Sequence, residues 1–182
     1  VLTTTPAIMY TGSGAISLLL APGEKTNIFI NQREICRRQS KLHREKKSNE
    51  ANVYYGGYLA GLSAEINKLN FQTEIDSDYP LFIQELKDKN AEEVKAYILE
   101  KQQSKLREIE NLKATKACKA VLHNAVNASA ASLLMFVPQI VQRVHIVNYK
   151  LEGEASKEYV KNNPVQLPDN FYDLLKDFSN LN

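Results

Sequence analysis

The sequence predicts a mainly α protein, an irregular bundle of four to six helices with an extended N-terminal arm or small β-hairpin. Three observations lead to this prediction. No Gly or Pro occurs at residues 91–131, where strong helix formers dominate. Apolar residues recur there at spacings of three and four, which places them on one helix face. Gly and Pro are instead frequent near the N-terminus, so we divide the chain into an arm at 1–32 and a helical domain at 33–182.

The N-terminal arm contains short apolar runs separated by turn residues. Gly12, Ser13 and Gly14 lie between two such runs, at residues 7–11 and 15–21. A Gly-Ser-Gly step in this position is typical of the tight turn of a β-hairpin. We therefore expect either a small hairpin or an extended arm that lies over the helical core.

Residues 33–47 form a basic segment. It contains seven basic and two acidic residues, a net charge of +5. Clustered positive charge favours contact with phosphates or another anionic surface. If the segment binds an anion, the residues that we expect to contact it are Arg33, Arg37, Arg38, Lys41 and Arg44.

Residues 51–70 have the pattern of a second helix. Apolar residues recur at spacings of four, three, four and three from Tyr55 to Leu69, as along a coiled-coil seam. Gly57 and Gly61 are four residues apart and would lie together beside that seam. Because glycine lets another backbone approach closely, we predict that Gly57 and Gly61 contact a partner helix.

A shorter helix is predicted after an acidic connector. Ser77, Asp78 and Pro80 suit the start of a helix that continues to Lys87. Nearby acidic side chains match positions 1, 3, 5 and 12 of a calcium-binding loop, but Tyr79 stands where that loop needs Gly. We therefore interpret the acidic residues as a solvated connector with a helix cap, and we predict no metal site and no cofactor.

The longest helical region extends from Asn90 to about Tyr149. Asn90 followed by Glu93 fits a capping box, in which each residue bonds the backbone N–H of the other. Pro138 should kink or end the helix, because proline lacks the N–H that a helix interior requires. We expect one long helix with a single break at Pro138.

The second half of this region has small apolar residues at spacings of three and four: Ala114, Ala117, Val121, Ala125 and Ala128. Residues at these spacings share one helix face. We predict that Ala117, Val121 and Ala125 face a neighbouring helix and contact a partner. Two short helices should follow, one at 154–162 and one after Asp169.

The sequence contains no P-loop, no HExxH zinc motif, no CxxC pair and no GxSxG nucleophile elbow. An enzyme of a class without short motifs is therefore a third hypothesis. Cys36 and Cys118 fit either one disulfide in an oxidising compartment or two buried thiols. The chain begins with Val1, which fits removal of a presequence or trimming, and we lean towards a secreted or extracytoplasmic protein.

We expect a non-enzymatic interaction protein, a structural or assembly subunit that binds protein partners or copies of itself through helix faces and the arm. The supporting observation is several packing faces without a convergent polar cluster. The alternative hypothesis is binding of nucleic acid or an anionic surface by residues 33–47. The net charge of +2 does not indicate a polyanion by itself. No uncharged apolar run reaches the roughly 18 residues that a membrane helix needs.

Overall fold

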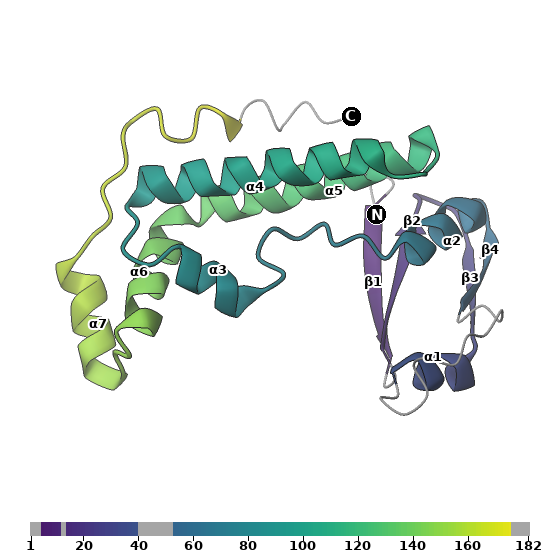
Figure 1. The fold of residues 1–182 in the computed structure, drawn as a ribbon, viewed down its shortest axis with the longest axis horizontal. Helices are drawn as coiled ribbons and strands as arrows, with labels where there is room; N and C mark the ends of the chain where they lie inside the picture. Colours follow the sequence, from purple (N-terminus) through teal and green to yellow (C-terminus); the bar gives the residue numbers. More distant parts are fainter. Residues whose placement is uncertain (1–4, 12–13, 40–52, 176–182) are drawn as a thin grey trace. The chain divides into compact units, whose positions relative to one another are not determined.

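The computed structural model describes residues 5–11, 14–39 and 53–175, and these form seven helices and four strands (Figure 1). The described part of the chain is mainly helical, which confirms the predicted mainly α fold. It divides into two compact units. Unit 1 comprises residues 1–71 and 114–121, and unit 2 comprises residues 72–113 and 122–182. The expected boundary between an arm and a helical domain at residue 32 stays a prediction.

Unit 1 begins with a β-hairpin. Strand β1 (Thr5–Thr11) pairs antiparallel with β2 (Gly14–Leu20), and the pairing ends where Thr11 meets Gly14. The small antiparallel sheet predicted near the N-terminus is therefore present. The Gly12-Ser13 part of the predicted turn lies outside the described residues.

A second antiparallel ribbon follows, formed by β3 (Thr26–Ile30) and β4 (Val53–Gly57). Helix α1 (Gln32–Gln39) comes between these strands in the chain, and α2 (Ala60–Leu69) follows them. The prediction of one helix over residues 51–70 was therefore wrong in its first part. Val53, Tyr54 and Tyr55 are strong strand formers, and pairing with β3 overrides the short run of helix-like spacing.

Gly57 and Gly61 do not share a helix face, so the basis for predicting them as a joint partner contact was wrong. Gly57 ends β4 with φ +105°, and a Cβ there would lie 2.2 Å from the carbonyl oxygen of Lys25. The ribbon therefore needs glycine at this position for backbone reasons. Gly61 lies on α2, and a Cβ there would meet no atom within 4 Å.

The two ribbons of unit 1 are joined by buried contacts. Ile16, Ile35 and Val53 form a small core from β2, α1 and β4. The hydroxyl of Ser63, a fully buried residue of α2, accepts a hydrogen bond from the Leu19 backbone N–H at 3.1 Å. Such a bond matters because a buried backbone N–H without a partner is costly.

Unit 2 is helical and contains α3 (Tyr79–Glu85), α4 (Ala91–Asn111), α6 (Val137–Asn148) and α7 (Gly153–Asn162). The predicted helix starts at Asp78 and Asn90 are confirmed. The Asp78 side chain accepts from the Leu81 N–H, and Asn90 forms the capping box with Glu93. The predicted short helix at 154–162 is also confirmed. Residues 169–174 form turns, Leu175 is helical, and the remainder of that predicted helix lies outside the described residues.

The region predicted as one long helix has an additional break. Helix α4 ends at Asn111, and α5 (Lys116–Met135) starts after a short turn. Thr115 caps α5, because its hydroxyl accepts from the Cys118 N–H at 3.2 Å. The carboxylate of Glu65 in turn accepts from the N–H and the hydroxyl of Thr115, each at 2.7 Å. Without Gly or Pro, this turn has only its threonine cap as a local signal.

The break predicted at Pro138 is confirmed. Helix α5 ends at Met135 and α6 begins at Val137 with Pro138 in its first turn, where a missing N–H costs nothing. The two helices are bent by 74°. Leu134 and Val137 on either side of the bend are both buried, in a core formed mainly by α3, α4, α5 and α6.

The buried stripe of α5 lies one residue away from the predicted face. The residues that are buried recur every four positions: Cys118, Leu122, Val126, Ala130 and Leu134. Ala117 is exposed, whereas Val121 and Ala125 are half-buried. The prediction that Ala117 faces a neighbouring helix of the same chain was therefore wrong. A one-residue shift turns a helix face by about 100°, and small alanines on both faces hide it from the sequence pattern.

Candidate functional site

Charge is divided between the two units. The sequence of unit 1 has eleven basic and five acidic residues, a net charge of +6, whereas unit 2 has twelve basic and sixteen acidic residues, a net charge of −4. The whole-chain value of +2 conceals this difference. Opposite net charges favour partners of different kinds for the two units.

Unit 2 has an apolar groove at the α5–α6 bend, which we call the corner groove. It has a volume of about 230 Å³ and is lined by Tyr79, Phe82, Ile83, Phe136, Gln139, Ile140 and Arg143. Phe82 and Ile83 are buried residues of α3, so the core fixes this part of the lining. Phe136 and Tyr79 are 53% and 45% exposed.

The helix bend explains why large apolar side chains are exposed at the end of α5. Leu134 and Val137 point into the core, and the break between them leaves Met135 and Phe136 outside it. Met135 is 57% exposed. In the sequence these residues belong to one apolar run at 133–137, which is indistinguishable from core until the bend is known.

Unit 1 has a second exposed apolar surface on the β3–β4 ribbon, which we call the aromatic face. Phe29 and Tyr54 are directly opposite each other in the strand register and are 69% and 52% exposed. Alternation along the strands places Ile28 and Tyr55 on the other side. The Tyr55 hydroxyl donates a 2.6 Å bond to the Ser17 carbonyl, and burial raises the pKa of Tyr55 to about 12.

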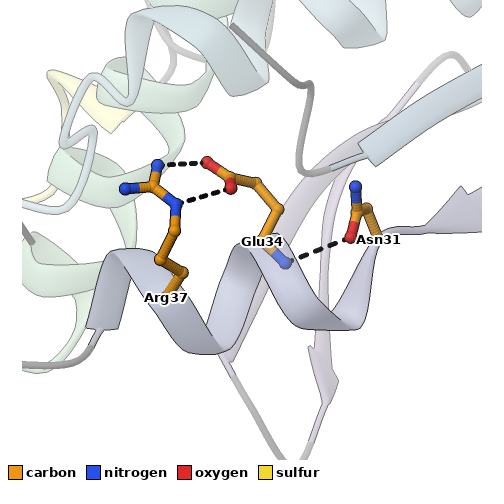
Figure 2. Close-up of polar contacts among 3 residues, drawn as sticks. All are labelled: Asn31, Glu34 and Arg37. Carbon is orange, nitrogen blue, oxygen red and sulfur yellow. Dashed lines mark hydrogen bonds and ion pairs between the residues drawn. The ribbon is translucent and has the colours of Figure 1, made fainter. Parts of the chain in front are cut away.

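The predicted anion-binding residues fall on α1 and beyond it. Asn31 caps this helix by accepting from the Glu34 N–H at 3.1 Å (Figure 2). The guanidinium of Arg37 donates two bonds, of 2.7 and 2.6 Å, to the nearly buried carboxylate of Glu34. Arg33 is exposed. The Arg38 side chain, Lys41 and Arg44 lie outside the described residues, so anion binding by this set stays a prediction.

Cys36 and Cys118 are not joined by a disulfide in the described structure. Cys36 is exposed on α1, and Cys118 is fully buried on α5. Burial, together with the negative charge of Glu65, raises the pKa of the Cys118 thiol to about 11. A thiol held neutral in this way is not activated as a nucleophile. The disulfide that the sequence allows stays a prediction.

A polar cluster links α3 and α4 at one side of a pocket of about 280 Å³. Tyr97 donates a hydrogen bond to Glu85, and Lys101 Nζ lies 3.2 Å from Glu85 Oε2. Burial and this bond raise the pKa of Tyr97, and the same bond lowers the pKa of Glu85. General acid–base catalysis needs a pKa near the working pH, so these shifts favour a structural link between the helices.

The ring of His145 on α6 lies between two tyrosine rings. Its centroid is 4.3 Å from that of Tyr149 and 4.1 Å from that of Tyr159 on α7. This stack holds α7 against α6 and gives His145 a packing role. No group of three potential metal ligands occurs among the residues that the structure describes.

No family model matches this chain, and no curated protein or solved structure matches it either. Within residues 5–11, 14–39 and 53–175, no single helix has the length and apolar character needed to cross a membrane. Helices α5 and α6 pass that test only jointly, as the bent pair described above.

Proposed function

We propose that this protein is a non-enzymatic interaction protein, a structural or assembly subunit whose helical unit binds a protein partner through the corner groove. The observation that carries the proposal is the exposure of two aromatic residues in the lining of that groove, Phe136 at 53% and Tyr79 at 45%. Large apolar side chains that are exposed together mark interaction sites, whereas single ones are common on any surface.

The size of the corner groove favours a protein side chain over a drug-sized ligand. Small-molecule pockets usually measure about 300–1,000 Å³, and this groove measures about 230 Å³. A groove of this size can accept one or two apolar side chains from a partner. A few buried side chains of this kind provide most of the binding energy in many interfaces. Because Phe82 and Ile83 are already buried in the core, the groove needs little ordering on binding.

The charge around the corner groove indicates the character of the partner. Among the residues that line the groove, Arg143 carries a positive charge, and it is exposed. A partner with apolar anchors flanked by Asp or Glu would complement this surface, and complementary rim charges mainly raise the association rate.

A photo-crosslinking experiment tests the proposal. Benzoylphenylalanine in place of Phe136 should crosslink one protein reproducibly, well above background, when the chain is irradiated in its source and then purified. The same group in place of Val160, which is 39% exposed on α7, should not. The variant Phe136→Ser should no longer bind the partner, while its circular dichroism spectrum should stay that of a helical protein. A protein that stays monomeric, with equal and low crosslinking at both positions, would contradict the proposal.

A second candidate function is binding of a polyanion by unit 1. Its supporting observation is the net charge of +6 in that unit. The ion pair between Arg37 and Glu34 reduces the positive charge that α1 presents to a polyanion. Binding to heparin that weakens steeply with salt would support this candidate. Equal retention on a heparin column and on an uncharged column would exclude it.

A further inference from the structure

The aromatic face of the β3–β4 ribbon has no role in the binding that we propose for the corner groove. Phe29 and Tyr54 are directly cross-strand neighbours, and such partners have Cβ atoms about 4.5–5.5 Å apart. They are 69% and 52% exposed. The apolar residues that stabilise the ribbon, Val53 and Ile28, lie on the opposite face. The outward aromatic pair is therefore not needed for the core of unit 1.

The next pair along the same face leaves the aromatic rings accessible. Asn27 is opposite Gly56 in the register, and Asn27 is exposed. Gly56 has no side chain, and a Cβ there would make only ordinary contact, 3.5 Å from the Asn27 Cβ. On one side, the Phe29–Tyr54 pair is therefore flanked only by a small polar pair, Asn27 and Gly56, which leaves room for a flat group against the rings. Tyr58, just after β4, is 75% exposed and adds a third aromatic ring to this part of the chain.

Charge distinguishes between a protein and a nucleic acid as the occupant. Unit 1 has a net charge of +6, and Arg33, three residues after β3, is exposed. A unit with a net positive charge attracts phosphates, and exposed aromatic rings stack with bases of any sequence. An apolar protein segment would use the rings but would gain nothing from the positive charge.

From this juxtaposition we infer that the aromatic face binds a single-stranded nucleic acid, with Phe29 and Tyr54 stacking against successive unpaired bases. The inference rests on the second candidate function, because the positive charge of unit 1 supplies the phosphate contacts. A single strand is required, since the faces of paired bases are covered by their neighbours within a duplex. Sequence preference should be weak, because every base has a face that can stack.

The chain contains no Trp, which permits a direct test. Tyr54→Trp introduces one fluorophore on the aromatic face. An oligothymidylate of about 16 nucleotides should quench its fluorescence, and heparin, which has charge but no bases, should not. Oligouridylate in a parallel titration shows whether RNA is preferred to DNA, and a duplex of equal length should bind more weakly than either strand.

Affinities measured by anisotropy of a labelled oligothymidylate complete the test. Phe29→Leu and Tyr54→Ala should each weaken binding about tenfold without changing the salt slope, because stacking releases no counterions. Tyr79→Ala, a variant at a 45% exposed aromatic residue of unit 2, is the matched control and should bind as the unaltered chain does. Phe29→Leu keeps an apolar side chain in the strand, so a loss of affinity reports stacking and not misfolding.

Three results would overturn the inference, and they separate it from the function on which it rests. Binding to heparin but not to the oligothymidylate would remove the stacking site and leave polyanion binding intact. Equal affinity of the unaltered chain, Phe29→Leu and Tyr54→Ala for the oligothymidylate would also exclude the stacking site and leave polyanion binding intact. No binding to either ligand at about 50 mM salt, where phosphate contacts are strong, would remove both.

Discussion

Replacing Gly57 and Gly61 by Ala should change stability in opposite directions. Gly57 has φ +105°, where an L-residue costs roughly 1–2 kcal/mol. The new Cβ would also lie 2.2 Å from the Lys25 carbonyl oxygen, more than 1 Å inside ordinary contact. Because that oxygen belongs to the backbone, the strand pair must shift, which costs about 1–2 kcal/mol more. We therefore expect Gly57→Ala to lower the free energy of unfolding by about 2–4 kcal/mol.

Gly61→Ala is the matched control. Its Cβ would meet no atom within 4 Å, and alanine favours a helix over glycine, so we expect a gain of about 0.5 kcal/mol. Urea unfolding followed by circular dichroism measures both changes, and the melting temperature of Gly57→Ala should fall by on the order of 10 °C. Equal effects of the two variants would refute this reasoning and would restore a shared helix face for the two glycines.

Three further variants test the packing of the two units. Ser63→Ala should cost about 1–3 kcal/mol, because it leaves a buried β2 N–H without its acceptor, whereas Ser132→Ala at an exposed site of α5 should be neutral in the same urea assay. Ala130→Leu should overpack the core and lower the free energy of unfolding by about 1–3 kcal/mol. Ala125→Leu, at a half-buried site, should lower it clearly less, and thermal melts measure both changes. Cys118 should react with iodoacetamide only after unfolding, since it is buried and its pKa is raised to about 11. The exposed Cys36 should be labelled in the native chain, so peptide mass spectrometry must locate the label, and fast labelling of Cys118 itself would contradict this prediction.

Local signals in the sequence located most helix starts, because each depends on a few adjacent residues. The capping box at Asn90 and Glu93 and the aspartate cap at Asp78 are present as predicted. Pro138 marks the bend for the same reason, since proline acts on its own helix turn. These elements could be predicted because the chemistry that fixes them lies within four residues along the chain.

Elements that depend on distant residues could not be predicted in this way. Strand β4 was read as helix because its partner β3 lies more than twenty residues earlier in the chain. Thr115 begins α5 with a glutamate fifty residues away as its second partner. The spacing of residues along α5 fitted two adjacent faces, and only packing selects the stripe that contains Val126 and Ala130.

The sequence could not show which of its apolar and aromatic residues form exposed surfaces, for a related physical reason. Exposure of an apolar side chain is a property of the fold and not of the residue type. Phe136 is exposed because the helix bends at that residue, and Phe29 and Tyr54 form one surface because two strands pair. Phe136, Phe29 and Tyr54 are not part of the buried cores, so their large rings stay in water. Burial would stabilise each ring by roughly 1.5–3 kcal/mol. For these two exposed apolar surfaces, on units of opposite net charge, we therefore propose two different partners, one for each unit.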